Sequence, residues 1–568
     1  MKSSSRLPQE VRAALAACRP HLYAAIAFSL AINVLYLALP IYSAQVYDRV
    51  VASGNLATLA MLSIAFVIAM AALAGLESVR TRLLNRAGLQ LEDRLAGRVM
   101  QAAVEQAVAA PGHDRLRPLR ELDSLRTLVT GGAVPAVLDL PWAVLFVAVL
   151  FFVHPALGLA ATVCAVILVA LAALNDVLSR RTLKAVAQAA ARTQAYADAT
   201  LRNAEIVQAS GMLDGLAARW RRERTQMLAA QGASVERGST LIAGIRFVRY
   251  AAQALVLGLG AWLAVERSIT PGAMFAASIL LGRAMQPVEQ LVGVWRQLVA
   301  ARESLQFVCA LLGTRPPRAA PITPSAPQGR LAVEDLVFVP PGGPRPALGK
   351  VTFALAPGES LGVLGPSAAG KSTLARLLVG VQPPTAGAVR LDDAAVASWA
   401  RADFGRHVGY LPQDVELFPG TVAENIARCG AVAPDEVLKA AQLAGAHEMI
   451  LRLPRGFETE VGDQGALLSA GQRQQIALAR AVYRRPCLVV LDEPNSNLDS
   501  AGETALVECL RRLKAAGTTV VLISHRMAAL QAVDRLLFLE SGAVKAYGPR
   551  DELLARLAPA PLRAAARH

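Results

Sequence analysis

The sequence predicts a multi-domain protein: an all-α domain of six membrane-spanning helices, followed by an α/β domain with a phosphate-binding loop. Three observations lead to this prediction. The chain has 568 residues, of which 54% are hydrophobic and 18% charged, so it is too apolar for an ordinary soluble protein and too long for one domain. Its first half contains long stretches without a charged residue. Its second half contains the pattern GxxxxGKS between a strand-like and a helix-like segment.

Four of the six spans are free of charged residues. A membrane-spanning helix needs about 20 apolar residues, and the first two spans lie within 22–47 and 50–76. The stretch 140–175 is too long for a single span. His154-Pro155 divides it into a hairpin of two helices, because proline cannot continue a helix.

The last two spans are expected over 241–265 and 269–290, where arginines interrupt the apolar pattern. Arg246 and Arg249 lie on one face of the fifth span, and Arg283 lies near the middle of the sixth. Asp139 lies at the start of the third span. Charged residues inside spans either form structural ion pairs or reach the membrane surface, or they line a transport path. The sequence leaves both interpretations open.

The distribution of charge orients the predicted spans. Residues 1–312 carry 30 Lys and Arg against 19 Asp and Glu. The two long loops, 77–136 and 175–240, contain nine and ten basic residues, so the positive-inside rule places them and both termini in the cytoplasm. This excess of positive charge faces anionic lipid of the bilayer. Nucleic-acid binding is not expected, because no basic stretch is interleaved with aromatic residues.

Composition sets the expected domain boundaries. The membrane domain is expected over 1–312, a proline-rich linker over 313–330, an α/β domain over 331–557 and a basic, disordered tail over 558–568. Short β-rich runs separated by helical patterns predict a mostly parallel sheet. These runs are Ser360–Leu364, Leu488–Leu491 and Thr519–Ile523. The six cysteines lie far apart and are expected to be reduced.

The loop that follows the run 360–364 is a nucleotide-binding P-loop. Its backbone N–H groups and the following helix N-terminus attract phosphate. Lys371 is expected to reach the β- and γ-phosphates, and the Ser372 hydroxyl to bind Mg²⁺. The residues expected to hold ATP are Gly365, Pro366, Ser367, Ala368, Ala369, Gly370, Lys371, Ser372 and Thr373.

Two carboxylates follow the buried run 488–491, at the sheet edge where open α/β sheets bind ligands. Asp492 suits a Mg²⁺-binding position, and Glu493 suits polarisation of the water that attacks the γ-phosphate.

The α/β domain resembles the ATPases of ABC transporters. Gln413, the segment Leu468–Gln472, the Asp492-Glu493 pair, the segment Asn497–Asp499 and His525 occur in that family's order. The resemblance implies an ABC-type nucleotide-binding domain in which Glu493, His525 and Gln413 are catalytic. It also implies that Gln413 joins Ser372 and Asp492 at Mg²⁺. Ser469, Gly471 and Gln472 would contact ATP held by a second copy, so a homodimer is implied.

Two features depart from that family's pattern. Ala470 stands where glycine is usual, and a methyl group there crowds the approach of phosphate. The aromatic residue that commonly stacks on adenine is absent from the segment 339–342, and Phe338 is the nearest ring.

The membrane half resembles the type I secretion ATPase/permeases, especially those of the alkaline-protease secretion type. The resembling segments are Gln45–Val50, Asp139–Trp142, Asn203–Ile206, Ser210–Met212 and Gly282–Pro287. The resemblance implies a bacterial inner-membrane exporter of an unfolded protein with a C-terminal signal. It also implies a periplasmic membrane-fusion adaptor and an outer-membrane channel as partners. Only about twenty residues precede the first span, so no leader-cleaving peptidase domain is expected.

Three other functions remain as alternatives. One is an exporter of lipids or small molecules, and another is an ATP-gated membrane protein that does not hydrolyse ATP. Glu493 argues against gating alone, since gating needs no catalytic carboxylate. A P-loop kinase would need neither the 468–472 segment nor six spans.

Overall fold

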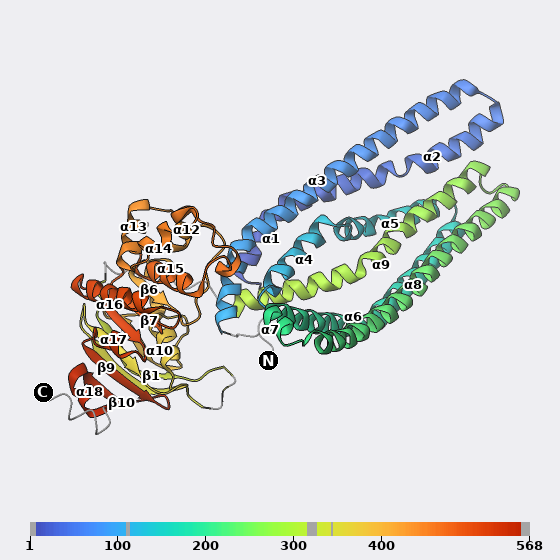
Figure 1. Ribbon diagram of the computed structural model, residues 1–568. Helices are drawn as coiled ribbons and strands as arrows, with labels where there is room; N and C mark the ends of the chain where they lie inside the picture. The colour runs from blue at the N-terminus through green and yellow to red at the C-terminus, as the bar shows by residue number, and fades with distance from the viewer. Residues whose placement is uncertain (1–6, 110–113, 315–326, 342, 344, 558–568) are drawn as a thin grey trace. The chain divides into compact units, whose positions relative to one another are not determined.

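The computed structural model describes residues 7–109, 114–314, 327–341, 343 and 345–557, and inside two long helices the side chains of 175–184, 234, 237, 238 and 241 are not described. The chain divides into two compact units near Pro316, and each is described here by itself (Figure 1). Most of the predicted linker and all of the predicted tail lie outside the described residues. The expected domain boundaries therefore stay a prediction.

The N-terminal unit is entirely helical in its described part, as expected. Its helices are α1 Gln9–Leu35, α2 Ala38–Gln45, the π-helix η1 Val46–Val51, α3 Leu56–Ala109, α4 Arg117–Thr130, α5 Ala133–Val153, α6 Pro155–Arg202, α7 Ala204–Ala209, α8 Leu213–Val265 and α9 Pro271–Thr314. Four of them exceed 40 residues, which is well beyond the roughly 20 that cross a bilayer. Figure 1 shows α6 and α8 running side by side over most of their length.

The predicted hairpin at His154-Pro155 is confirmed. His154 ends α5 with an extended backbone, and Pro155 is the first residue of α6. The Nδ1 atom of His154 accepts a hydrogen bond from the N–H of Ala156 at 3.2 Å. This bond satisfies one of the free N–H groups at the start of α6.

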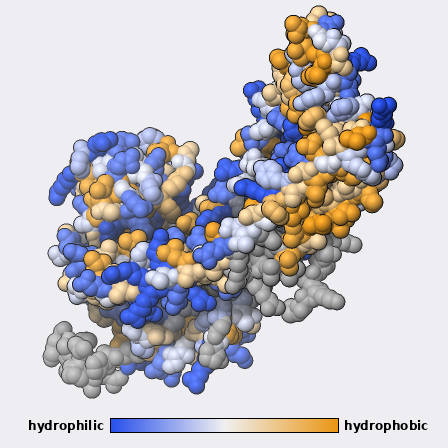
Figure 2. All heavy atoms as spheres, turned by 90° about the vertical axis from the view of Figure 1, so that its right-hand side faces the viewer, coloured by the Kyte–Doolittle hydropathy of each residue, from blue (hydrophilic) through white to orange (hydrophobic). Residues whose placement is uncertain are grey.

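Five helical stretches in the described chain are long and apolar enough to cross a membrane. They are Gln9–Val51, Leu56–Ala109, Arg117–Val153, Pro155–Leu174 and Ile242–Val265. Helix α9, the expected sixth span, is not among them, because Arg283 and Gln286 interrupt its apolar run. Figure 2 shows apolar surface on this unit. Its exposed apolar side chains include Phe152, Leu159 and Val265.

Helix α9 nevertheless joins the two apolar cores of the membrane unit. Towards its start, Leu281 packs in a cluster with residues of α5, α6 and α8. Towards its end, Val308 packs with residues of α1, α3 and α4. A membrane helix that is buried among other helices needs less apolar surface than one that faces lipid.

Three of the four charged residues within spans form ion pairs. Asp139 is buried and accepts hydrogen bonds from Arg80 of α3 at 2.8 Å and from Ser29 of α1 at 2.5 Å. Arg246 and Arg249 both contact the Glu289 carboxylate of α9, at 3.3 and 3.0 Å. The structural ion-pair interpretation is confirmed for these three residues.

The turn between α8 and α9 is held by an aspartate of η1. Asp48 accepts hydrogen bonds from the N–H of Gly272 at 2.8 Å and from the hydroxyl of Thr270 at 2.6 Å. Its carboxylate thereby caps the N-terminus of α9, where negative charge is favourable. The rings of Tyr47 and Phe275 stack beside it with centroids 4.1 Å apart.

Close packing between α9 and the α2–η1 segment explains why residue 272 is a glycine. A Cβ atom on Gly272 would lie 2.4 Å from the carbonyl oxygen of Ala44 and 2.6 Å from the Asp48 carboxylate. Both distances are shorter than any ordinary contact, so α2 and α9 would have to separate. Gly258 in α8 is the opposite case, since a Cβ there would meet nothing within 4 Å.

We expect Gly272→Ala to destabilise the membrane unit by about 1–3 kcal/mol, because the added methyl group overpacks the junction. Gly258→Ala is the matched control and is expected to be neutral or slightly stabilising, since alanine favours helix. Thermal unfolding of the full chain in detergent measures both. Equal midpoints for the two variants would contradict the proposed clash.

The C-terminal unit contains two sheets in its described part. Strands β2 Leu348–Leu355, β1 Leu331–Phe338, β4 Ala386–Leu391 and β5 Ala394–Ala395 form an antiparallel sheet in that order. The second sheet has the order β10-β9-β3-β8-β7-β6. Its strands are β10 Ala543–Pro549, β9 Arg535–Glu540, β3 Ser360–Leu364, β8 Thr519–Ile523, β7 Leu488–Asp492 and β6 Val408–Leu411. All of its pairings are parallel except that of β10 with β9. The predicted mostly parallel sheet is therefore confirmed, and the antiparallel sheet was not predicted.

Helices cover this scaffold and bury two apolar cores. They are α10 Lys371–Leu378, α11 Arg401–His407, α12 Val422–Ile426, α13 Pro434–Leu443, α14 His447–Leu451, α15 Ala470–Val482, α16 Ser500–Ala515, α17 Met527–Leu530 and α18 Arg550–Leu557. Side chains of β3, β7 and β8 are almost all buried, as expected for central parallel strands. One core lies between the two sheets and α10, and the other lies beneath α12–α16.

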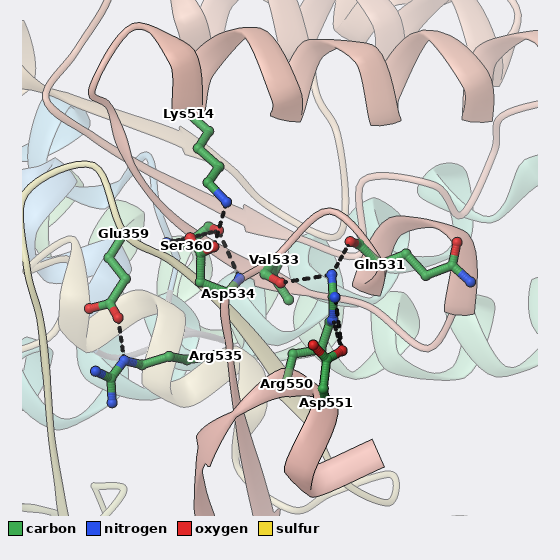
Figure 3. A network of polar contacts seen from close by, with 9 residues as sticks. All are labelled: Glu359, Ser360, Lys514, Gln531, Val533, Asp534, Arg535, Arg550 and Asp551. Atoms are coloured by element: carbon green, nitrogen blue, oxygen red, sulfur yellow. Dashed lines mark hydrogen bonds and ion pairs between the residues drawn. The ribbon is translucent and has the colours of Figure 1, made fainter. Parts of the chain in front are cut away.

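A polar network ties the N-terminal ends of β3 and β9 together, opposite the end of β3 that leads into the P-loop (Figure 3). The Asp534 carboxylate accepts hydrogen bonds from the backbone N–H and the hydroxyl of Ser360, at 3.1 and 2.7 Å. Lys514 of α16 pairs with the same carboxylate. Arg550 of α18 donates to backbone oxygens of Gln531 and Val533. The network therefore fixes α16 and α18 to the start of the sheet.

We expect Asp534→Asn to remove a stability increment that depends on pH. Burial raises the pKa of Asp534, but the hydrogen bonds from Lys514 and Ser360 outweigh burial and lower the net pKa. A lowered carboxyl pKa stabilises the fold above the ordinary value of about 4, and the effect is lost as pH falls through the folded-state pKa. Thermal unfolding from neutral to acidic pH should show the native chain and the variant converging at low pH. A constant difference would contradict this.

Candidate nucleotide site

The P-loop connects β3 to α10, and its conformation requires glycine at both ends. Gly365 has φ +152°, and a Cβ atom there would lie 2.2 Å from the carbonyl oxygen of Leu539. Gly370 has φ +98°, and its Cβ would lie 2.9 Å from the carbonyl oxygen of Ala347. The two glycines let the loop curl so that the N-terminus of α10 opens into the cavity.

Ala368 adopts a left-handed conformation inside this loop, with φ +62°. Such a conformation costs a residue with a Cβ atom about 1 kcal/mol. Local strain of this kind is common where a backbone is shaped around a ligand.

A cavity of about 260 Å³ lies against the P-loop. Its lining includes seven of the nine residues expected to hold ATP, namely Ser367, Ala368, Ala369, Gly370, Lys371, Ser372 and Thr373. Gly365 and Pro366 contribute differently: their carbonyl oxygens accept hydrogen bonds from the Lys371 ammonium at 2.7 and 3.0 Å. The cation is buried at the loop, where a phosphate group would be attracted to it.

Asp492 and Ser372 fit the expected Mg²⁺ site. The Oδ1 atom of Asp492 is buried and has no hydrogen-bond partner within the described chain, although buried carboxylate oxygens are normally satisfied. Burial raises the pKa of Asp492, a hydrogen bond from Ser372 lowers it and the adjacent Glu493 raises it, for a net increase. A divalent cation there would compensate the buried charge, since Mg²⁺ binds through a few protein oxygens together with phosphates.

The three expected catalytic side chains lie together. The Gln413 amide donates a hydrogen bond to Glu493 Oε2 at 3.0 Å. His525 Nε2 lies 3.8 Å from Glu493 Oε1. Glu493 itself directly follows β7 with φ +48°. Gln413 and Glu493 line the P-loop cavity, so the carboxylate faces the place where phosphate would lie.

The Ser469–Gln472 segment lies elsewhere. Ser469 and Gln472 form a reciprocal capping box at the start of α15, with each side chain bonded to the other's backbone N–H at 3.2 and 2.9 Å. None of Ser469, Gly471 and Gln472 lines the P-loop cavity described above.

No aromatic side chain of the described residues lines the cavity beside the P-loop. Phe338, the nearest ring in the sequence, is 7% exposed and belongs to the core. Ala347 occupies the adjoining wall. Gly342 lies outside the described residues.

Sequence reasoning missed two residues that position the catalytic loop. Ser524 donates to the Asn495 side chain at 3.0 Å, and both residues are buried. The Gln474 amide of α15 donates to the Pro494 carbonyl at 3.0 Å. These bonds hold the segment after Glu493 in place. Ser524 and Gln474 each lie beside a segment that the resemblance includes, at 525 and at 468–472, which is too weak a signal to indicate a role.

Comparison with known proteins places both units in one family. A family described as the ABC transporter transmembrane region matches residues 22–288, and the family described as ABC transporter matches residues 348–496. The type I secretion system ATP-binding protein PrsD of Rhizobium meliloti (strain 1021) is 40% identical over 559 residues, which cover 98% of this chain and 96% of PrsD. The chain belongs to the ABC transporters of type I secretion systems.

Other relatives agree with this membership. The cyclolysin secretion/processing ATP-binding protein CyaB of Bordetella pertussis is 32% identical, over 93% of this chain and 75% of CyaB. A bacterial Atm1-family ABC exporter with ATP bound is similar in structure, with a TM-score of 0.82, 24% identity and coverage of 97% of this chain and 99% of that chain. The latter likeness shows the fold alone. The transporter is thus a membrane-embedded ATPase.

We expect Glu493→Gln to lower the ATPase rate of the transporter about a hundredfold or more, the scale of a lost general base, while ATP still binds. Glu448→Gln, on the exposed face of α14, is the control and should retain the native rate. Phosphate release by purified protein in bilayers measures the rate. If the two variants hydrolyse ATP equally fast, the catalytic role of Glu493 is wrong.

Proposed function

We propose that two copies of this chain form the inner-membrane, ATP-driven exporter of a type I secretion system. Its cargo is an unfolded protein with an uncleaved C-terminal signal. The export route continues through a periplasmic membrane-fusion adaptor and an outer-membrane channel. ATP and Mg²⁺ are the substrate and the metal of the hydrolytic cycle.

One observation carries this proposal: the similarity to PrsD covers both chains almost completely. The similarity therefore includes the membrane unit, in which any specificity for cargo must lie, and not only the widely shared ATPase. Relatives named for the translocation of RTX-I toxin and for the export of leukotoxin match over 93% of this chain. An exporter of lipids or small molecules is the alternative that the experiment below must exclude.

The residues of the site support a sequence of roles for hydrolysis. P-loop N–H groups and Lys371 hold the β- and γ-phosphates. Ser372 and Asp492 would hold Mg²⁺, which neutralises charge that develops on the phosphates. Glu493 accepts the proton of the attacking water, and Gln413 orients the carboxylate through its 3.0 Å hydrogen bond.

The second copy supplies the remaining donors in this proposal. Ser469 is the N-cap of α15, and the N-terminus of that helix would present its positive dipole end to a γ-phosphate. His525 lies beside Glu493 and would contact the same phosphate. Closure of two such sites draws the two ATPase units together, and hydrolysis releases them. The attached membrane helices then alternate between two arrangements.

We expect deletion of the gene to remove one or a few whole proteins from the culture medium. Native protein expressed in trans should restore them, whereas the Glu493→Gln variant should not, because export requires hydrolysis. Mass spectrometry of the medium measures the loss, and Glu448→Gln serves as the matched control. An unchanged set of secreted proteins, with an altered lipid or metabolite profile, would favour the alternative.

A further inference from the structure

The membrane unit contains a polar cavity of about 530 Å³. Its wall includes Tyr36, which directly follows α1, Glu77 of α3 and Arg283, Gln286 and Gln290 of α9. Charged and amide side chains are costly within a membrane unless they have a partner or a function. The partners of these side chains therefore indicate which of them remain available to a ligand.

Asp139, which also lines the cavity, is already neutralised. It accepts hydrogen bonds from Arg80, Ser29 and Asn33, at 2.8, 2.5 and 3.1 Å. Both Arg80 and Asp139 are buried. This pair contributes structure to the wall and almost no net charge to the cavity.

Arg283 is the cation that retains binding capacity. Its guanidinium lies over the Tyr36 ring, 4.1 Å from the centroid, and donates to Gln286 at 3.0 Å. No carboxylate among the described residues lies within ion-pair distance of it. The Tyr36 ring and the hydrogen bond to Gln286 hold the guanidinium plane in place. They leave several of its five N–H donors available to a ligand.

Pro287 shapes this part of the wall. It lies inside α9, is buried and lines the cavity. Because proline has no N–H, it cannot donate the helical hydrogen bond to the carbonyl of Arg283. The carbonyl of Arg283 therefore lacks its usual helical hydrogen-bond donor.

We infer that this cavity binds an extended segment of the exported polypeptide and that Arg283 holds the carboxylates of its Asp and Glu side chains. The inference rests on the proposed export of protein and adds the chemistry of the recognised segment. Guanidinium–carboxylate pairs are strong and can be bidentate where water is scarce. The amides of Gln286 and Gln290 match the N–H and C=O groups of an extended backbone.

Glu77 adds a negative charge to the cavity wall. It is bonded to the hydroxyl of Tyr36, whereas Arg283 lies over the face of the same ring. The two opposite charges are thus held on one tyrosine. A carboxylate is attracted to Arg283 and repelled by Glu77. Removal of the Arg283 charge should therefore weaken the binding of acidic segments, and removal of the Glu77 charge should strengthen it.

The test uses the full-length protein in phosphatidylcholine nanodiscs and two fluorescent Gly/Ser-rich peptides. One peptide carries evenly spaced glutamates, and the other carries glutamines in their place. We expect the native protein to bind the glutamate peptide more tightly. Arg283→Ala should weaken that binding about tenfold, which equals a loss of about 1.4 kcal/mol. Arg283→Lys should retain part of it, and Glu77→Gln should strengthen it.

The matched control is Arg267→Ala, which removes an exposed arginine from the α8–α9 turn and should leave peptide affinity unchanged. Retained basal ATPase activity shows that each variant is folded. Equal affinity of the native protein for the two peptides, or no loss in Arg283→Ala, would overturn the inference. The inference would also be overturned if phosphatidylglycerol in the discs abolished peptide binding to the native protein, and did so by occupying Arg283. The ligand of the site would then be lipid phosphate.

Failure of this inference and failure of the proposed function can be told apart. If the peptides bind equally but gene deletion still removes proteins from the medium, only the role of Arg283 falls. If neither peptide binds and no secreted protein is lost, protein export itself is wrong.

Discussion

Attraction between phosphate and a curled backbone loop is the interaction on which the rest of this transporter depends. The loop can curl because Gly365 and Gly370 occupy conformations in which a Cβ atom would strike neighbouring carbonyls. The parallel sheet then brings Asp492 and Glu493 to the same edge, since β3 and β7 both flank β8 and run parallel to it. Phosphate-binding donors and carboxylates therefore lie within one site, although about 120 residues separate them along the chain.

We propose that this site is incomplete in a single chain. The start of α15 carries the positive dipole end of a helix and a small exposed residue, Ala470, but it does not line the P-loop cavity. A dimer that joins one copy's P-loop to the other's α15 would make nucleotide binding and subunit closure the same event. The free energy of ATP binding and hydrolysis would then move the attached membrane helices directly.

Local sequence patterns predicted the elements that carry nucleotide chemistry. The P-loop, the strand before Asp492-Glu493 and the hairpin at His154 each follow from residues adjacent in sequence, because glycine, proline and buried strands act over short range. Partners remote in sequence were not predictable. Asp48 meets Gly272, and Arg80 meets Asp139, but nothing in either segment names its partner. The antiparallel sheet was also missed, and its strand β1 pairs with β4 although β2, β3 and α10 lie between them along the chain.

The most direct test of the shared site counts trapped nucleotide in dimers that carry Glu493→Gln in both copies. Lys371→Ala removes the phosphate cation. Ala470→Glu places a repelling charge at the exposed start of α15, where a glutamate suits the helix. When either of these two changes is present in both copies, we expect no retained ATP. Purified dimers in which one copy carries Lys371→Ala and the other carries Ala470→Glu should retain one ATP, because both changes fall in the same composite site and the other site is intact. Dimers with neither change should retain two. Mixed dimers that retain none would contradict the account.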